Sequence, residues 1–100
     1  MTQVKLSPIQ ETVIKKLARG WTLKSHRFLD GRKLYKLYPL VGPAETVRSS
    51  TVAVLKRKGL IYSNHKFPAA AYTLTNEGKT LAAAWGETVV GLSTIVQFEQ

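Results

Sequence analysis

Glycine and proline divide this chain of 100 residues into short segments, and this division most limits the folds that it can form. The strongest turn signals stand at Gly20, at Asp30-Gly31, between Pro39 and Pro43, and at Gly59. No segment reaches the roughly 18 consecutive apolar residues that a transmembrane helix needs, so we expect no membrane span. With 44% hydrophobic residues, the chain can instead build one small domain with its own core.

The first segment has the features of a helix over residues 8–19. Ser7 is a good N-cap, Pro8 suits the first helical position, and Gln10 completes a capping box. Gly20 is a typical residue just beyond a helix end.

Two further helices are predicted from the same kind of signal. Apolar residues recur at helical spacing over residues 44–58, and Gly59 follows them. Thr75 can cap a third helix that begins at residue 76. Beyond Gly86 the pattern fits a helix and a strand equally, because a spacing near 3.5 residues coincides with many β-branched residues.

Extended segments separate the predicted helices. Asp30-Gly31 favours a hairpin that joins strands over residues 21–29 and 32–38. Residues 60–62 and 71–74 are typical of two more strands, with residues 63–70 as the loop between them. The order helix, hairpin, helix, hairpin, helix predicts a compact α+β domain.

The charge is high and unevenly placed. Fifteen Lys and Arg residues face six Asp and Glu residues, for a formal net charge of +9, and all the basic residues precede residue 80. Such a charge favours a polyanionic partner, nucleic acid first and an acidic membrane surface second. Residues 87–100 are apolar and contain no basic residue, so we expect them either to join two copies of the chain or to pack back on the core.

The composition argues against several kinds of chemistry. The absence of cysteine excludes disulfides, thiolate metal sites and cysteine nucleophiles, and two histidines make a metal site a poor hypothesis. The six carboxylates show no spacing typical of acid–base catalysis, and there is no glycine-rich phosphate loop. We therefore expect a protein without cofactor or metal that is not an enzyme.

The predicted helix over residues 44–58 has an outward face that is both slender and basic. A helix that enters the major groove needs small or hydroxyl-bearing residues near base edges and cations near phosphates. The loop that follows it, and the first hairpin, add further basic residues that could contact the backbone. The candidate nucleic-acid contacts are Arg48, Ser49, Ser50, Val52, Ala53, Lys56, Arg57, Asn64, His65, Lys66, Arg27, Arg32 and Lys33.

Two runs in this region resemble those of a known class of proteins. Residues 50–61, with the sequence STVAVLKRKGLI, resemble the recognition helix and first wing strand of winged helix-turn-helix proteins. Residues 72–81, with the sequence YTLTNEGKTL, are similar to the second wing strand of the MarR and PadR regulators, which carry a Tyr-x-Leu-Thr-x-x-Gly pattern. The resemblance covers about residues 44–85.

This resemblance implies a winged-helix domain over residues 1–86 that binds double-stranded DNA as a transcriptional regulator. Helix 44–58 would enter the major groove and wing 60–74 would lie on the adjacent backbone, in a cytoplasmic, nucleoid-associated homodimer joined by residues 87–100. Winged-helix proteins usually have a short helix before the recognition helix. Here either such a helix lies within residues 39–46 or the first hairpin replaces it. The alternatives are an RNA-binding protein and a winged-helix adaptor for protein partners.

Overall fold

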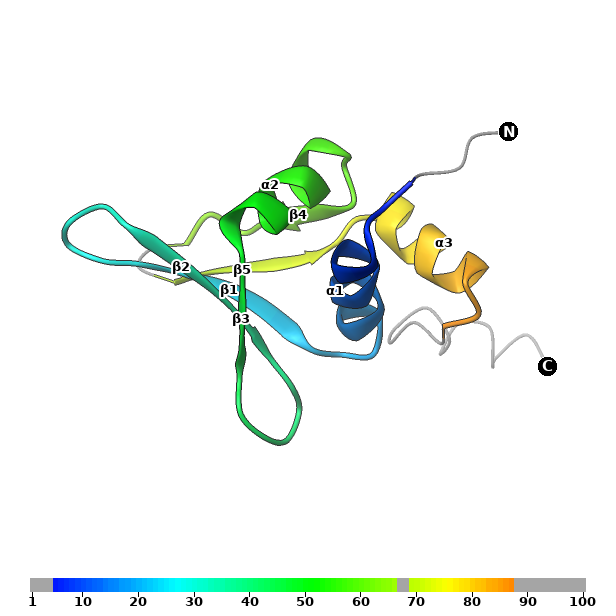
Figure 1. Cartoon of the computed structure of the whole chain (residues 1–100), viewed down its shortest axis with the longest axis horizontal. Helices are drawn as coiled ribbons and strands as arrows, with labels where there is room; N and C mark the ends of the chain where they lie inside the picture. Colours follow the sequence, from blue (N-terminus) through cyan, green and yellow to red (C-terminus); the bar gives the residue numbers. More distant parts are fainter. Residues whose placement is uncertain (1–4, 67–68, 88–100) are drawn as a thin grey trace.

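A computed structural model describes residues 5–66 and 69–87, which form an α+β arrangement of helices packed on an antiparallel sheet (Figure 1). The elements in chain order are α1 (Pro8–Ala18), β1 (Thr22–Arg27), β2 (Lys33–Tyr38), β3 (Glu45–Val47), α2 (Ser49–Arg57), β4 (Ile61–Ser63), β5 (Ala69–Leu74) and α3 (Asn76–Ala84). In this described part, no helix is both long and apolar enough to cross a membrane.

The first helix begins and ends where the local sequence predicts. The Ser7 hydroxyl accepts a hydrogen bond from the Gln10 backbone N–H at 3.3 Å, and the Gln10 side chain accepts one from the Ser7 N–H at 3.0 Å. This reciprocal pair satisfies two donors that the first helical turn leaves free. Gly20 has a φ of +103°, a conformation that glycine adopts without strain, and it directs the chain out of the helix into β1.

The sheet has the strand order β3–β2–β1–β5–β4, and every neighbouring pair is antiparallel. The predicted first hairpin is confirmed as β1 and β2, with Leu23 opposite Leu37 and Arg27 opposite Lys33. At its tip the Asp30 carboxylate accepts a hydrogen bond from the Arg32 backbone N–H at 3.0 Å, as an Asx turn does.

The second predicted helix is too long at its N-terminus. Residues 45–47 form the edge strand β3, in which Val47 lies opposite Tyr35 of β2, and helical structure begins only at Ser49. The strand hydrogen bonds satisfy the backbone there, and Val47 enters the core. No helix lies within residues 39–46, so the hairpin and β3 stand where a winged-helix protein would place a second helix.

The second predicted hairpin is present with shifted bounds. Its strands are β4 and β5, so residue 63 and residues 69–70, predicted as loop, are extended instead. Ile61 lies opposite Leu74, and both side chains enter the core, which explains why the ladder holds at this end. Residues 67–68, in the middle of the predicted wing, lie outside the described part.

One face of the sheet carries the core. Leu23, Leu37 and Tyr72 share this face, because they are opposite one another in the register. The helices α1 and α2 cover it with the side chains of Ile14 and Leu55, both fully buried. These contacts place α2 on the outside of the molecule, at the top of the view in Figure 1.

The third predicted helix is confirmed as α3, and Thr75 caps it as expected. The Thr75 hydroxyl accepts a hydrogen bond from the Gly78 N–H at 3.1 Å and donates one to the Gly59 carbonyl at 2.6 Å. Gly78 lies so close to the Leu60 carbonyl oxygen that a Cβ there would overlap it. This close approach is a physical reason for the glycine in the run that resembles the MarR and PadR pattern.

Just after α3, Glu87 is tied to Arg19, the residue that follows α1. Its carboxylate accepts two hydrogen bonds from the Arg19 guanidinium, at 2.9 and 3.0 Å. The first residue of the predicted C-terminal tail therefore belongs structurally to the body of the domain. The rest of that tail, residues 88–100, lies outside the described part, and its predicted role in dimerisation stays a prediction.

Candidate nucleic-acid interface

The exposed face of α2 is small and polar at its start and basic at its end. Five candidate contacts share this face, at positions one, two, five, eight and nine of the helix: Ser49, Ser50, Ala53, Lys56 and Arg57. Positions at this spacing lie on one side of an α-helix. The opposite side is turned to the sheet, where Thr51 and Leu55 are buried. The prediction that Ser49 and Ala53 point outward is confirmed.

The prediction that Val52 contacts nucleic acid is wrong. Its side chain is 1% exposed and packs in the core, so it cannot reach a base edge in this conformation. The sequence offers valine at both 52 and 54, and helical spacing alone does not say which one faces inward. The packing of α2 on β2 and β4 decides it, because Val52 points to the sheet while Val54 is only half-buried.

A shallow groove runs between α2 and the sheet. It is lined by Tyr35 from β2 and, from the helix, by Ser49, Val52 at the buried floor, Ala53, Lys56 and Arg57. The Tyr35 ring packs edge-on against the Tyr72 ring, with centroids 6.1 Å apart. Burial raises the pKa of the Tyr35 hydroxyl, with Tyr72 adding to the effect, so the phenol stays neutral at physiological pH. The groove therefore offers a hydroxyl beside two cations, and Tyr35 is a groove residue that is not among the candidate contacts predicted from the sequence.

A basic depression of about 300 Å³ continues from this groove on the same side of the sheet. Lys56 lines both hollows and connects them. The rim is built from three further segments, with Arg27 of β1, Lys33 of β2 and Lys66 of the β4–β5 loop. Serine hydroxyls line the same depression, from Ser25 and Ser63. Cations and hydroxyls are the side chains that proteins use to contact phosphate oxygens.

The loop after β4 is held in a defined shape by its own side chains. The Asn64 side-chain oxygen accepts hydrogen bonds from the backbone N–H groups of Lys66, at 3.0 Å, and Ala71, at 3.1 Å. The Ser63 hydroxyl accepts one from the His65 N–H at 2.9 Å, and His65 has a φ of +58°, which non-glycine residues rarely adopt. Asn64 therefore positions the loop, while His65 and Lys66 line the depression.

Two predicted contacts lie apart from this surface. Arg32 is at the tip of the first hairpin, where its guanidinium pairs with the Asp30 carboxylate at 2.7 Å and lies over the Phe28 ring. Arg48 is the N-cap residue of α2 and is exposed, but it borders a different hollow, between α1 and β3. The structure thus brings together Arg27, Lys33, Lys56, Arg57, His65 and Lys66, and leaves these two arginines at the margins.

No carboxylate lines the groove or the basic depression in the part of the chain that the structure describes. Asp30, Glu45 and Glu87 pair with cations elsewhere. The two hollows therefore form one positive surface, which we call the α2 surface. Within residues 5–66 and 69–87, no three His, Asp or Glu side chains lie close enough together to hold a metal ion.

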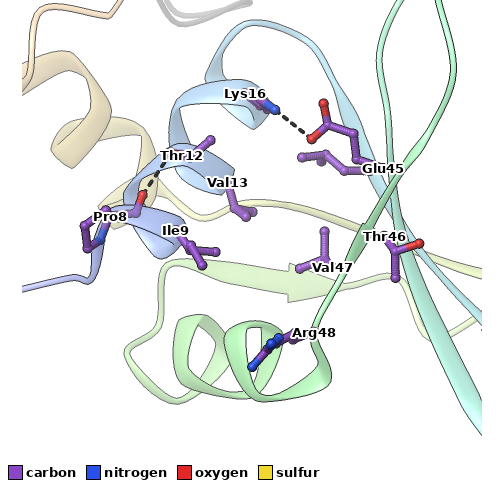
Figure 2. Close-up of a pocket in the computed structure, with 10 residues that line it drawn as sticks. Pro8, Ile9, Thr12, Val13, Lys16, Glu45, Thr46, Val47 and Arg48 are labelled. Atoms are coloured by element: carbon purple, nitrogen blue, oxygen red, sulfur yellow. Dashed lines mark hydrogen bonds and ion pairs between the residues drawn. The ribbon is translucent and has the colours of Figure 1, made fainter.

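A third hollow differs from the other two because its surface is mainly apolar. It lies between α1 and β3 and is lined mainly by apolar side chains, including Ile9, Val13 and Val47 (Figure 2). At one border, the Lys16 ammonium pairs with the Glu45 carboxylate at 2.7 Å. Ile9 is 63% exposed, so this hollow presents apolar surface to solvent.

Comparisons with protein-family models, with curated proteins and with solved structures found no match to this chain. The case for a function therefore rests on the surfaces themselves.

Proposed function

We propose that the chain binds double-stranded DNA through the α2 surface, as a transcriptional regulator of winged-helix type in the cytoplasm. The observation that carries this proposal is the exposed face of α2, where small and hydroxyl-bearing residues precede Lys56 and Arg57. The B-DNA major groove, about 12 Å wide, admits an α-helix, and slender residues allow the helix backbone to approach the base edges.

The strand order supports the same proposal. A winged-helix protein has a helix, a strand, a second helix, a recognition helix and a two-stranded wing that pairs with the first strand. Here α1, β1, α2 and the β4–β5 hairpin follow in that order, and β1 pairs with β5. The departure is β2 and β3, which stand in the place of the second helix.

The phosphate contacts of this proposal come from the rim of the basic depression. With Ser49, Ser50 and Ala53 at the base edges, Lys56 and Arg57 lie at the border between bases and backbone. Lys33, Arg27 and Lys66 lie farther out on the same side of the sheet, where a neighbouring stretch of backbone would pass. The β1–β2 tip and the neighbouring ends of β4 and β5 lie at the same end of the molecule (Figure 1).

In vitro selection from a random duplex library tests the proposal. We expect enrichment of a defined sequence, pseudo-palindromic if the chain dimerises, with half-sites about one helical turn apart. Binding should weaken steeply with salt: if about five phosphates are contacted per protomer, the log–log slope is roughly −4.5. Binding that is unchanged between 50 and 200 mM salt would contradict the proposal.

RNA binding is the main competitor, since a positive surface attracts any polyanion. The deep, narrow major groove of A-form RNA does not admit a helix, so α2 could not act as a reading element there. Competition between duplex DNA and duplex RNA of one sequence separates the two. Tighter binding of the RNA would reject the DNA proposal and move the contacts to the loops.

A protein-interaction adaptor is the second competitor, and the apolar hollow between α1 and β3 favours it (Figure 2). Apolar surface left in solvent is a common sign of a protein partner. Elution from a heparin column at low salt would favour this function over both nucleic-acid functions.

A further inference from the structure

The face of the sheet opposite α2 has a composition of its own. Alternation along β1 and β2 turns Leu23 and Leu37 to the core, so Lys24 and Lys36 point to the other side. Tyr72 is buried on β5, so Thr73 is on this other side too, together with its partner Tyr62 of β4. We call it the open sheet face, and define it by Lys24, His26, Lys36, Tyr38, Tyr62 and Thr73.

The Tyr38 side chain reaches along the open sheet face toward His26. Tyr38 is opposite Thr22 in the register, but its hydroxyl bonds to the Nε2 atom of His26 at 2.8 Å. His26 is four residues beyond Thr22, which is about 13 Å along the strand. The two side chains must therefore extend toward each other over the sheet, and the bond between them fixes the ring.

A cation already lies over this ring. The Lys24 ammonium lies 5.7 Å from the centroid of the Tyr38 ring, on a side chain long enough to swing away. A planar base could cover the ring in place of the ammonium.

The two lysines on the open sheet face lie where their charges lower the stability of the sheet. Lys24 and Lys36 are directly opposite on neighbouring strands, where like charges destabilise a sheet. Among residues 5–66 and 69–87, neither lysine has an ion-pair partner, and no carboxylate shares this face with them. A bound anion would remove the repulsion.

We propose that the open sheet face binds single-stranded DNA, with a base stacked on Tyr38 and the adjacent phosphates on Lys24 and Lys36. Flat aromatic rings beside cations are the elements with which proteins hold single strands, since every base has a face that can stack. Tyr62, 56% exposed on β4, offers a second ring at the far edge of the same face. The choice of DNA rests on the proposed function, whereas the stacking surface does not.

Fluorescence anisotropy with a labelled 15-nucleotide oligo-dT tests the proposal in the full chain. The double variant Lys24→Gln/Lys36→Gln should bind this strand roughly tenfold more weakly at low salt, because two phosphate contacts are lost. Binding to duplex DNA should change less than twofold. Arg57→Ala is the opposite control: it should weaken binding of duplex DNA and leave binding of the single strand unchanged.

Stacking is separated from charge with an abasic strand of the same length. Tyr38→Leu should weaken oligo-dT binding roughly 5- to 100-fold and leave binding of the abasic strand unchanged. Tyr38→Phe keeps the ring and should lose much less. A circular dichroism melt identifies a variant that fails to fold. If Tyr38→Leu fails to fold, the double lysine variant and Tyr38→Phe test the proposal in its place.

Three results would overturn the proposal. They are no binding of oligo-dT, equal loss of single-strand and duplex binding in the lysine variant, and equal loss of oligo-dT and abasic binding in Tyr38→Leu. A matched oligo-U strand bound at least tenfold more tightly than oligo-dT would assign the face to RNA instead. A chain that binds oligo-dT but does not bind duplex DNA would reject the proposed function and leave this inference standing.

Discussion

The end of the molecule formed by α1 and α3 uses its cations differently from the α2 surface. On α1, Lys16 pairs with Glu45 and lies over the Trp21 ring, and Arg19 makes a two-bond pair with Glu87. On the α2 surface, Lys56, Arg57 and Lys66 have no carboxylate partner among the described residues. The cations of one end contribute to the fold, and those of the other remain available for a polyanion.

This difference shows that net charge alone does not locate a binding surface. The value of +9 counts all cations equally, although Lys16 and Arg19 are already paired with carboxylates. What marks the α2 surface is the exclusion of carboxylates from it. The predictions below test whether the two ends differ in this way, from the largest expected effect to the smallest.

Leu55→Ala should have the largest effect, on stability. Leu55 is fully buried beneath α2, and removing its side chain leaves a cavity between the helix and the sheet. We expect the free energy of unfolding to fall by about 2–5 kcal/mol in urea denaturation. Val54→Ala, at a half-buried position of the same helix, should lose less. A larger loss at Val54 would mean that the packed side of α2 is assigned wrongly.

Arg57→Ala should have the next largest effect, on binding. If Arg57 contacts a base, duplex affinity should fall by about 1–3 kcal/mol, measured by anisotropy with a selected sequence. Lys58→Ala is the matched control, because Lys58 is also exposed but lies off the outward face of α2. Equal losses of duplex affinity in both variants would indicate that only the positive charge matters. They would contradict the assignment of the outward face of α2 to base contacts.

Lys16→Ala compared with Lys56→Ala tests the two ends directly. Each change removes one positive charge, but Lys16 is already paired with Glu45. We expect Lys16→Ala to change duplex affinity less than twofold and to cost about 1–2 kcal/mol of stability, because it removes both the pair with Glu45 and the contact over the Trp21 ring. Lys56→Ala should weaken duplex binding with little loss of stability. The comparison fails if the two variants bind equally.

The pair between Arg19 and Glu87 should give the smallest effect, which is present at neutral pH and lost in acid. The hydrogen bonds from Arg19 hold the pKa of the Glu87 carboxyl below its ordinary value of 4.5. A carboxyl whose pKa is lowered by folding stabilises the protein above its unfolded pKa, and this contribution is lost as the pH falls through the folded value.

Urea midpoints at pH 7 and in steps below pH 4.5 measure this effect. The native chain should exceed Glu87→Gln in stability at pH 7, and the difference should shrink as the pH falls. A difference that does not depend on pH would mean that the carboxylate charge contributes nothing to the pair.

Much of the secondary structure could be predicted from local signals. The capping box at Ser7, the cap at Thr75 and the Asp30-Gly31 turn each act within a few residues, and all three are present as expected. The edge strand β3 could not be predicted in this way. Its backbone is satisfied by β2, a partner about ten residues earlier, and local propensity does not report such a pairing.

The candidate site was predicted only in part, for the same reason. The outward positions of Ser49 and Ala53 follow from helical spacing, but the inward turn of Val52 follows from contact with the sheet. Tyr35 is not among the predicted contacts, because it reaches the groove only when β2 passes beneath α2.

By itself, the sequence determined where α1 and α3 begin, where the chain turns and how much positive charge the molecule carries. These properties depend on short stretches of backbone and on composition. Only the tertiary structure decided which cations are neutralised, which meet around one depression and which side of the sheet stays open. Those properties depend on distances between residues far apart in the chain, which only folding brings together.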